Sequence, residues 1–263
     1  MTATDRNATA PAPLQSFKVK TLSYNIHKGF SMGNQRFVLA RIRAALRGIQ
    51  ADVVFLQEVS GGHQGRRRNR FQNHPQPAYL ADTLWPYVAY GKNAVYRAGH
   101  HGNAVLSKFP IIRWENEDVS TNPFERRGLL HAALKTPNRD VELHVICLHL
   151  NLLKRGRLKQ VEQLCGRIEA SVPPEAPLIV AGDFNDWRVE ISSILRRRLH
   201  LQEAHEHLHE RHARTFPSWL PVFKLDRIYF RGFTPLRAKP MKGRPWRTLS
   251  DHTAIFTELV LDP

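Results

Sequence analysis

Short apolar runs recur along this chain of 263 residues, and amphipathic helical patterns separate them. The runs at 52–56 (DVVFL) and 178–181 (LIVA) are too short for helices and rich in Val, Ile and Phe, which is typical of buried strands. Strands that alternate with helices in both halves of a chain favour an α/β fold, in which helices cover packed sheets. The predicted helices span 35–49, 78–85, 158–170 and 187–199, and the other predicted strands span 19–24, 94–96, 102–106, 129–134, 141–148, 225–230 and 254–260.

The domain organisation follows from the start of the chain and from the segments between these patterns. Residues 1–17 are rich in Ala, Thr and Pro and lack the apolar core of a signal peptide, so we expect a flexible tail. No internal stretch has the composition of a linker, so residues 18–263 are predicted to form a single domain. No segment approaches the roughly 18 apolar residues that a membrane-spanning helix needs. We therefore expect a cytoplasmic monomer.

The charge of the chain narrows the class of its partners. Lys and Arg number 39 against 23 Asp and Glu, which gives a formal net charge of +16. This charge attracts polyanions, so nucleic acid, an anionic phospholipid surface and phosphorylated small molecules are the candidate partners. It carries no information about the fold.

Polar side chains follow several predicted strands at the point where each strand ends. The stretch AGDFND at 181–186 sets Asp183 and Asn185 directly after an apolar run. Carboxylates in apolar surroundings are costly unless they are paired or bind a metal, so this stretch is either a tight turn or a site. Ligands gather at strand ends in α/β proteins, which favours a site. The other members of this set are Asn25, Glu58, His149 and the tripeptide SDH at 250–252, which precedes the last predicted strand.

The order of these motifs is specific, although each motif alone is weak. They are SYNIH (23–27), LQEV (56–59), GNAVLSKFPI (102–111), LHLN (148–151), AGDFND (181–186), LDRIY (225–229) and SDH (250–252). Together they resemble the endonuclease/exonuclease/phosphatase superfamily, the DNase I-like phosphoesterases, and within it a bacterial subgroup of unassigned substrate. The resemblance implies a four-layer α/β/β/α sandwich, with two central mixed sheets flanked by helices and a site at one end of the sheets.

The resemblance also implies a bound Mg²⁺, with Mn²⁺ as an alternative, since such enzymes use a cation to polarise the phosphate. Mg²⁺ prefers oxygen ligands and is usually held by one or two carboxylates. Glu58 is then the direct ligand, Asn25 is a ligand or a neighbour of the ligands, and Asp251 completes the set directly or through water. Without the resemblance, Asn25 is a strand-end cap and Glu58 a surface acid.

The catalytic residues implied by the resemblance are His149, Asp183, Asn185, Asp226 and His252. Asp183 would orient and deprotonate the attacking water, and Asn185 would point the same way if the segment stays extended. His252 would contact the scissile phosphate, and Asp226 would fix its ring and favour its charged form. Whether His252 acts as a base or as a protonated stabiliser stays open. His149 would contact the phosphate, and its alternative is a buried structural histidine.

Residues outside this central set extend the predicted site. Asn103 would bind phosphate or shape the rim, and Asp186 would form a turn or cap the helix predicted at 187–199. The stretch HEHLHERH at 205–212 resembles a metal-binding tract, but its helical spacing predicts a solvated helix. Four arginines soon after Glu58 would clamp a phosphate backbone or lie in a solvated loop. They are Arg66, Arg67, Arg68 and Arg70.

Three functional hypotheses follow. The leading one is a Mg²⁺-dependent, endonuclease-like phosphodiesterase that cleaves nucleic acid, for which the basic charge is the main support. The second is a phospholipid or small-molecule phosphodiesterase or phosphatase at an anionic membrane surface. The third is a catalytically silent phosphate-binding protein, which the complete set of polar residues argues against. The loops decide the substrate of such a fold, so DNA against RNA, endo against exo action and the number of metal ions stay open.

Overall fold

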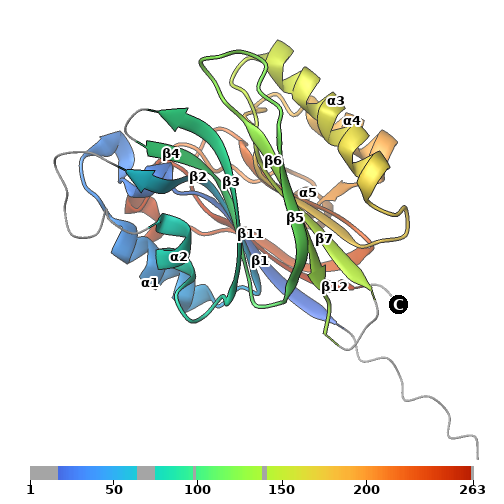
Figure 1. Ribbon diagram of the computed structural model, residues 1–263, viewed down its shortest axis with the longest axis horizontal. Helices are drawn as coiled ribbons and strands as arrows, with labels where there is room; N and C mark the ends of the chain where they lie inside the picture. Colours follow the sequence, from blue (N-terminus) through green and yellow to red (C-terminus); the bar gives the residue numbers. More distant parts are fainter. Residues whose placement is uncertain (1–16, 64–74, 97–98, 138–140, 262–263) are drawn as a thin grey trace, which may run out of the picture.

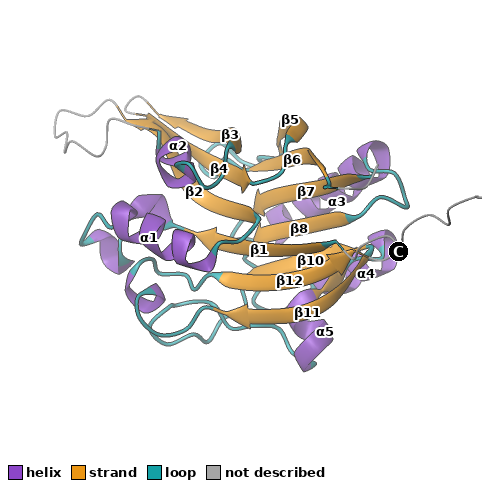
Figure 2. Cartoon of the chain, turned by 90° about the horizontal axis from the view of Figure 1, so that it is seen from below, coloured by secondary structure: helices purple, strands orange, loops and turns teal. Residues whose placement is uncertain are grey.

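Two six-stranded sheets packed face to face form the centre of the computed structural model, which describes residues 17–63, 75–96, 99–137 and 141–261 (Figures 1 and 2). Helices cover the outer face of each sheet, so the layers run helix, sheet, sheet, helix. This confirms the predicted four-layer sandwich with mixed central sheets. Residues 1–16 of the predicted tail lie outside the described residues.

The first sheet has the strand order β11–β12–β1–β2–β4–β3. Its strands are β1 (Lys18–Asn25), β2 (Val53–His63), β3 (Tyr87–Tyr96), β4 (Gly99–Ser107), β11 (Phe233–Pro240) and β12 (Ile255–Leu261). Helices α1 (Leu39–Ile49) and α2 (Gln76–Ala81) cover its outer face. Three short 3₁₀ helices are η1 (His27–Gly29), η2 (Met32–Asn34) and η3 (Trp246–Thr248).

The second sheet has the strand order β5–β6–β7–β8–β10–β9. Its strands are β5 (Ile111–Asp118), β6 (Gly128–Lys135), β7 (Glu142–His149), β8 (Leu178–Asp183), β9 (Gln202–Glu203) and β10 (Asp226–Arg231). Helices α3 (Lys154–Ser171) and α4 (Ile191–Leu199) cover its outer face, and α5 (Ala204–His209) packs against β10 and β11. No helix among the described residues is long and apolar enough to cross a membrane.

Strand β2 shows how the layers are held together. Val53 and Phe55 point into the core between the two sheets, while Val54 and Leu56 belong to the core beneath α1. Successive side chains of a strand alternate between its faces, so a strand that is buried on both faces needs a continuous apolar run. The run DVVFL meets this requirement, which is why the sequence predicted it.

The structure differs from the predicted elements at strand lengths, helix starts and sheet edges. β2 continues to His63, and α1 and α4 begin at Leu39 and Ile191, later than predicted. The sequence did not predict β5, β9 and β11, each of which is an edge strand of its sheet. β5 is exposed or half-buried along its length, so it lacks the apolar run by which a central strand is recognised.

The histidine-rich stretch after β9 is only partly solvated, so the prediction for 205–212 was wrong in this respect. The short helix α5 turns one face toward β10 and β11, and both His205 and His212 are buried. His212 Nδ1 lies 3.0 Å from Glu203 Oε2, so this histidine is paired inside the fold.

A buried ion pair fixes the turn that follows β8. Arg227 on β10 and Asp186 are fully buried, and Arg227 Nη1 donates to Asp186 Oδ2 at 3.0 Å. The same carboxylate accepts the backbone N–H groups of Glu190 (3.2 Å) and Ile191 (3.0 Å). Asp186 therefore binds the first turn of α4, whose positive end favours an acid, and not a helix that begins at 187.

We predict that Asp186→Ala lowers the free energy of unfolding by about 3–5 kcal/mol, because it leaves the buried Arg227 without its charge partner. The matched control is Glu142→Ala, which breaks the exposed pair with Arg113 (2.7 and 2.5 Å) and should cost less than about 1 kcal/mol. Urea denaturation of both variants measures the difference. Equal losses in the two variants would contradict this role of the buried pair.

Candidate active site

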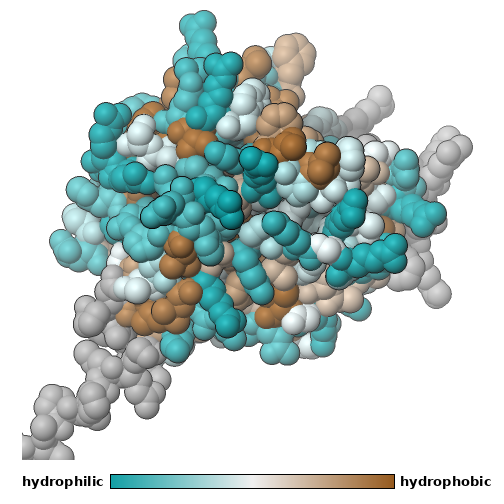
Figure 3. Space-filling model, turned by 180° about the vertical axis from the view of Figure 1, so that it is seen from behind, coloured by the Kyte–Doolittle hydropathy of each residue, from teal (hydrophilic) through white to brown (hydrophobic). Residues whose placement is uncertain are grey.

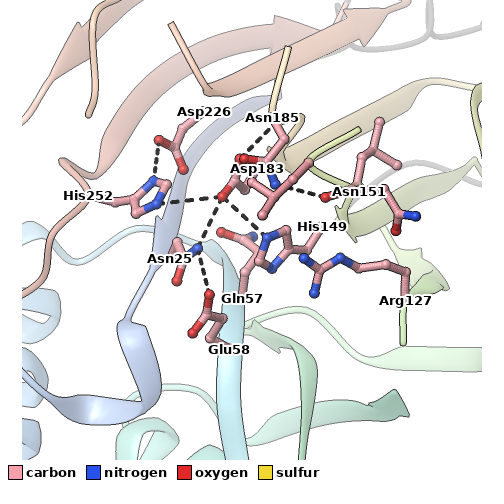
Figure 4. A network of polar contacts seen from close by, with 12 residues as sticks. Asn25, Gln57, Glu58, Arg127, His149, Asn151, Asp183, Asn185, Asp226 and His252 are labelled. Atoms are coloured by element: carbon pink, nitrogen blue, oxygen red, sulfur yellow. Dashed lines mark hydrogen bonds and ion pairs between the residues drawn. The ribbon is translucent and has the colours of Figure 1, made fainter. Parts of the chain in front are cut away.

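Strand direction gathers the predicted polar residues at one end of the sandwich (Figure 4). β1 and β2 are parallel, so Asn25 and Glu58 leave the first sheet at the same edge. β7 and β8 are also parallel and set His149 opposite Asp183. β10 runs antiparallel to β8 and begins at Asp226, which is in register with Asp183. Residues that are far apart in the sequence therefore meet because of the strand pairing.

Asp183 lies at the centre of this network (Figure 4). Its Oδ2 accepts a hydrogen bond from Asn25 Nδ2 at 3.1 Å and lies 3.4 Å from His149 Nε2 and 3.6 Å from His252 Nε2. The residue is 1% exposed. Burial raises the pKa of the Asp183 carboxyl, and the positive charge of His252 acts in the opposite direction.

The stretch AGDFND is both a turn and part of the network. Asp183 Oδ1 accepts the backbone N–H of Asn185 at 3.0 Å, and Asn185 has a φ of 50°, so the segment does not stay extended. The expectation that Asp183 and Asn185 point the same way in an extended segment was therefore wrong. Asn185 nevertheless reaches the same cavity, where its Nδ2 donates to the carbonyl oxygen of Leu150 at 2.8 Å.

The two histidines beside Asp183 have opposite pKa shifts. His252 Nδ1 lies 2.9 Å from Asp226 Oδ2 while Nε2 faces Asp183, so each ring nitrogen faces a carboxylate. Burial disfavours the charged ring, but these two acids outweigh it and raise the pKa of His252. Burial, helped by the charge of Arg127, holds the pKa of His149 well below its ordinary value. A charged and a neutral imidazole thus flank one carboxylate.

Glu58 offers the carboxylate that is best suited to a cation. It is half-buried, and among the described residues no Lys or Arg forms an ion pair with it. Its nearest polar neighbour is Asn25 Nδ2 at 3.5 Å, whereas Asn25 Oδ1 accepts the backbone N–H of His27 at 3.1 Å. The donor chemistry fits Mg²⁺, with Asn25 placed to hold the ligand in position.

Asp251 lies beside this pair and is linked to it through Ser250. The Ser250 hydroxyl lies 2.8 Å from the carbonyl oxygen of Asn25 and 3.2 Å from Asp251 Oδ1, which in turn lies 3.6 Å from His27 Nδ1. A second acidic cluster, Asp183 with Asp226 and His252, has ligand atoms within 4.8 Å of one another. His252 already stands between those two acids, so that cluster is paired internally.

Backbone strain is concentrated at this end of the sheets. Glu58 has a φ of 55° and lies at an irregularity where the register with β4 shifts between Leu56 and Val59. His27 and Lys28 have φ values of 46° and 55°. Left-handed backbone is unfavourable for such side chains and persists where the surrounding structure enforces it, which is common at functional sites.

A cavity of about 370 Å³ opens beside the network. Its polar side includes Glu58, His149, Asp183, Asn185 and His252, joined by Arg127 from the segment before β6. The other lining residues are apolar. The apolar lining consists of Leu152, Trp187, Phe216, Phe223 and Leu225.

Asn103 lies away from the network around Asp183. Asn103 is buried and donates from Nδ2 to the carbonyl oxygens of Gly128 (3.0 Å) and Cys147 (3.3 Å), so it links the two sheets beneath the rim. This placement supports a shaping role more than phosphate contact. The basic cluster at 66–70, Arg66, Arg67, Arg68 and Arg70, lies outside the described residues.

Comparison with known proteins assigns the family. The model of the "Endonuclease/Exonuclease/phosphatase family" matches residues 22–252. The chain belongs to this family. Its members hydrolyse phosphoric esters, and the chain is a phosphoric ester hydrolase of this kind.

Relatives and solved structures agree with this assignment. The chain is 42% identical over 254 residues to the uncharacterized protein YbhP of Escherichia coli K12. The match covers 95% of this chain and all of YbhP. A family member from Beutenbergia cavernae has a TM-score of 0.75 at 19% identity and covers 93% of this chain and 72% of its own. A D. rerio TDP2, complexed with single strand DNA product, has a TM-score of 0.66 at 21% identity and covers 92% and 98%. These structures share the fold.

Sequence reasoning missed Arg127 and the apolar side of the cavity. Arg127 sits in the cavity wall, yet in the sequence it was indistinguishable from its exposed neighbour Arg126. Its position directly before β6 is the signal that could have identified it. The aromatic residues Trp187 and Phe223 come from separate loops and meet only in the folded chain, with ring centroids 6.5 Å apart.

We predict that Glu58→Asn leaves the metal-free protein as stable as wild type or more stable by up to about 1 kcal/mol, because Asn tolerates left-handed backbone. Glu210→Asn is the matched control, since Glu210 has a φ of 57° at the C-terminal end of α5. Denaturation is measured in EDTA and again with Mg²⁺. Mg²⁺ should stabilise wild type and Glu210→Asn but not Glu58→Asn. Equal stabilisation of all three proteins would remove Glu58 from the metal site.

Proposed function

We propose that this chain is a divalent metal-dependent phosphodiesterase in which residues 18–263 act as one catalytic unit. The observation that supports it most is the buried Asp183, which lies between a charged and a neutral histidine and accepts a hydrogen bond from Asn25, whose amide nitrogen also lies 3.5 Å from Glu58. Phosphodiester hydrolysis needs a cation on the phosphate, an activated water and positive charge near the oxygens of the transition state. The network offers a group for each of these needs.

The cation site is proposed at Glu58, with Asp251 as a second ligand, directly or through water. Asn25 holds Glu58 in position through its amide nitrogen, and Ser250 connects Asn25 to Asp251. These residues would hold Mg²⁺ or Mn²⁺, which would supply Lewis-acid polarisation of the phosphate. The scissile phosphate then lies between Glu58 and the two histidines.

In this proposal Asp183 orients the attacking water and accepts its proton, and Asn185 shapes the turn that holds Asp183. The raised pKa of Asp183 makes it a better base than an exposed aspartate. His252, kept charged by Asp226, stabilises negative charge on the phosphate oxygens. The neutral His149 donates a hydrogen bond to the phosphate, and Arg127 adds a positive charge at the cavity wall.

Nucleic acid is the first candidate substrate. The net charge of +16 favours a polyanion, and the D. rerio TDP2 of the same fold was solved with a single strand DNA product. A phospholipid is the second candidate, because apolar side chains form one side of the cavity beside the polar network. Both substrates contain the phosphodiester that the polar network suits.

We predict that Asp183→Asn lowers the phosphodiesterase rate by about 10²–10⁴-fold, because it removes the proton acceptor and preserves the shape of the side chain. Asp52→Asn is the matched control, since Asp52 precedes β2 at the opposite end of the sandwich and pairs with Lys108 at 3.0 Å. The assay is nicking of supercoiled plasmid with Mg²⁺, repeated with EDTA and with phospholipid as substrate. A folded Asp183→Asn protein with the wild-type rate would refute the assignment of Asp183.

We predict that Arg127→Met raises KM by about 10–100-fold with a smaller change in kcat, because a charge-assisted contact to phosphate is lost. Arg126→Met is the matched control, because the neighbouring side chain is 48% exposed and pairs with Asp118. Steady-state kinetics on a soluble phosphodiester measures both constants. A KM for Arg127→Met that equals that of Arg126→Met would exclude a phosphate contact.

A further inference from the structure

Exposed apolar side chains lie on the loops beside the active-site cavity, and three of them, Leu152, Trp187 and Phe223, line it. We define the apolar rim as Leu152, Leu153, Trp187, Trp219, Leu220 and Phe223. Every member is exposed, and the most exposed are Leu153 at 73% and Leu220 at 56%. Soluble proteins rarely gather such residues at one place without a partner, although isolated exposed apolar residues are ordinary.

The rim residues lie on loops that also carry the catalytic network. Leu152 and Leu153 follow β7, and Trp187 follows the turn after β8. Trp219 and Leu220 lie in a segment whose ends are joined by the pairing of Phe216 with Phe223. In Figures 1 and 3 the end at which β7 terminates is uppermost, and Figure 3 shows brown apolar side chains among teal ones at that end.

Unpaired cations accompany the rim. Arg155, Arg188 and Lys224 are close neighbours of rim residues in the sequence, and within the described part of the chain none of them forms an ion pair. The acids of the same loops are neutralised. Glu125 pairs with Arg127 at 2.8 Å, and Glu190 pairs with Lys154 at 2.7 Å. The rim therefore presents apolar tips within a positively charged border.

We propose that the apolar rim docks the protein on an anionic phospholipid bilayer, with the cavity opening toward the headgroups. Apolar and aromatic side chains enter the boundary between headgroups and acyl chains, and flanking Lys and Arg bind the anionic headgroups. The phosphodiester of a bound lipid can then enter the cavity that Glu58 and Asp183 line. The assignment of a membrane phospholipid as substrate rests on the proposed phosphodiesterase function, whereas the docking does not.

The chemistry of the rim favours a bilayer over the other possible occupants. Aromatic side chains can stack on nucleic acid bases, but the aliphatic Leu152, Leu153 and Leu220 offer no stacking surface and gain only from burial in an apolar phase. A second copy of the chain would bring two positively charged borders together and would cover the cavity. A bilayer satisfies the apolar tips and the cations at once.

The test is co-sedimentation of the full chain with vesicles of phosphatidylcholine, with and without phosphatidylglycerol. Wild type should bind the anionic vesicles. The double variant Trp219→Ser/Leu220→Ser should bind them at least about tenfold more weakly, because two inserted apolar side chains are lost. The matched control is Trp114→Ser/Leu236→Ser, on β5 and β11. Trp114 is 49% exposed and Trp219 48%, while Leu236 is 45% exposed and Leu220 56%.

Other outcomes overturn the docking. Wild type that stays in the supernatant, or equal losses in the rim and control variants, would exclude it. A rim variant that loses DNA binding and keeps vesicle binding would assign the rim to nucleic acid. A wild-type dimer that the rim variant abolishes, with vesicle binding unchanged, would assign the rim to a second copy.

A parallel assay separates the docking from the proposed function. Hydrolysis of soluble bis(p-nitrophenyl) phosphate with Mg²⁺ should be equal in wild type and in both double variants, because neither pair contacts the cavity network. Vesicle binding without any hydrolysis in the three proteins would defeat the phosphodiesterase proposal and leave the docking intact. Hydrolysis by a wild type that fails to bind vesicles would do the reverse.

Discussion

The central strands of both sheets are buried on both faces, and the position of the candidate site depends on this constraint. Val53, Val54, Phe55 and Leu56 are all completely buried, with alternate side chains in different cores. An unpaired polar side chain in the middle of such a strand would be costly, which favours the strand ends as the place for polar groups that bind a ligand. The parallel pairs β1–β2 and β7–β8 then bring four of these ends to the same edge.

The same burial sets the electrostatics of the site. Asp183 is removed from water and needs compensation, which His252 supplies as a cation and Asn25 as a hydrogen-bond donor. The charged form of His252 in turn depends on Asp226. Without Asp226, Asp183 would be the main acid left to offset the burial of the charged ring. Asp186, three residues after Asp183, is neutralised separately by Arg227. The two acids of AGDFND thus serve different purposes: one belongs to the site, and the other anchors the turn that carries it.

The layered fold and the members of the site could be predicted from the sequence because they depend on short patterns. Apolar runs revealed the central strands, and the motifs around Glu58, Asp183 and His252 appeared in family order. The edge strand β5 could not be predicted in this way, since it needs no buried run. The left-handed backbone of Asn185 also escaped prediction, because it depends on the hydrogen bond that Asp183 accepts from the Asn185 N–H. Arg127 differs from Arg126 in lining the cavity, and that cavity is formed by loops that are separate in the sequence.

The net charge cannot choose between nucleic acid and a membrane, because both are polyanions. The two partners differ, however, in which exposed apolar side chains they would bury. Leu152 and Leu153 lie on the loop after the strand that ends at His149, and Trp187 follows the turn that holds Asp183. The strands that carry the catalytic groups therefore also carry these rim residues. A single-stranded nucleic acid would use the aromatic residues and leave the leucines in water. A bilayer would use both kinds of side chain and bring its phosphates to the cavity opening, so the proposed docking would place the phosphodiester of a lipid, the second candidate substrate, at the site.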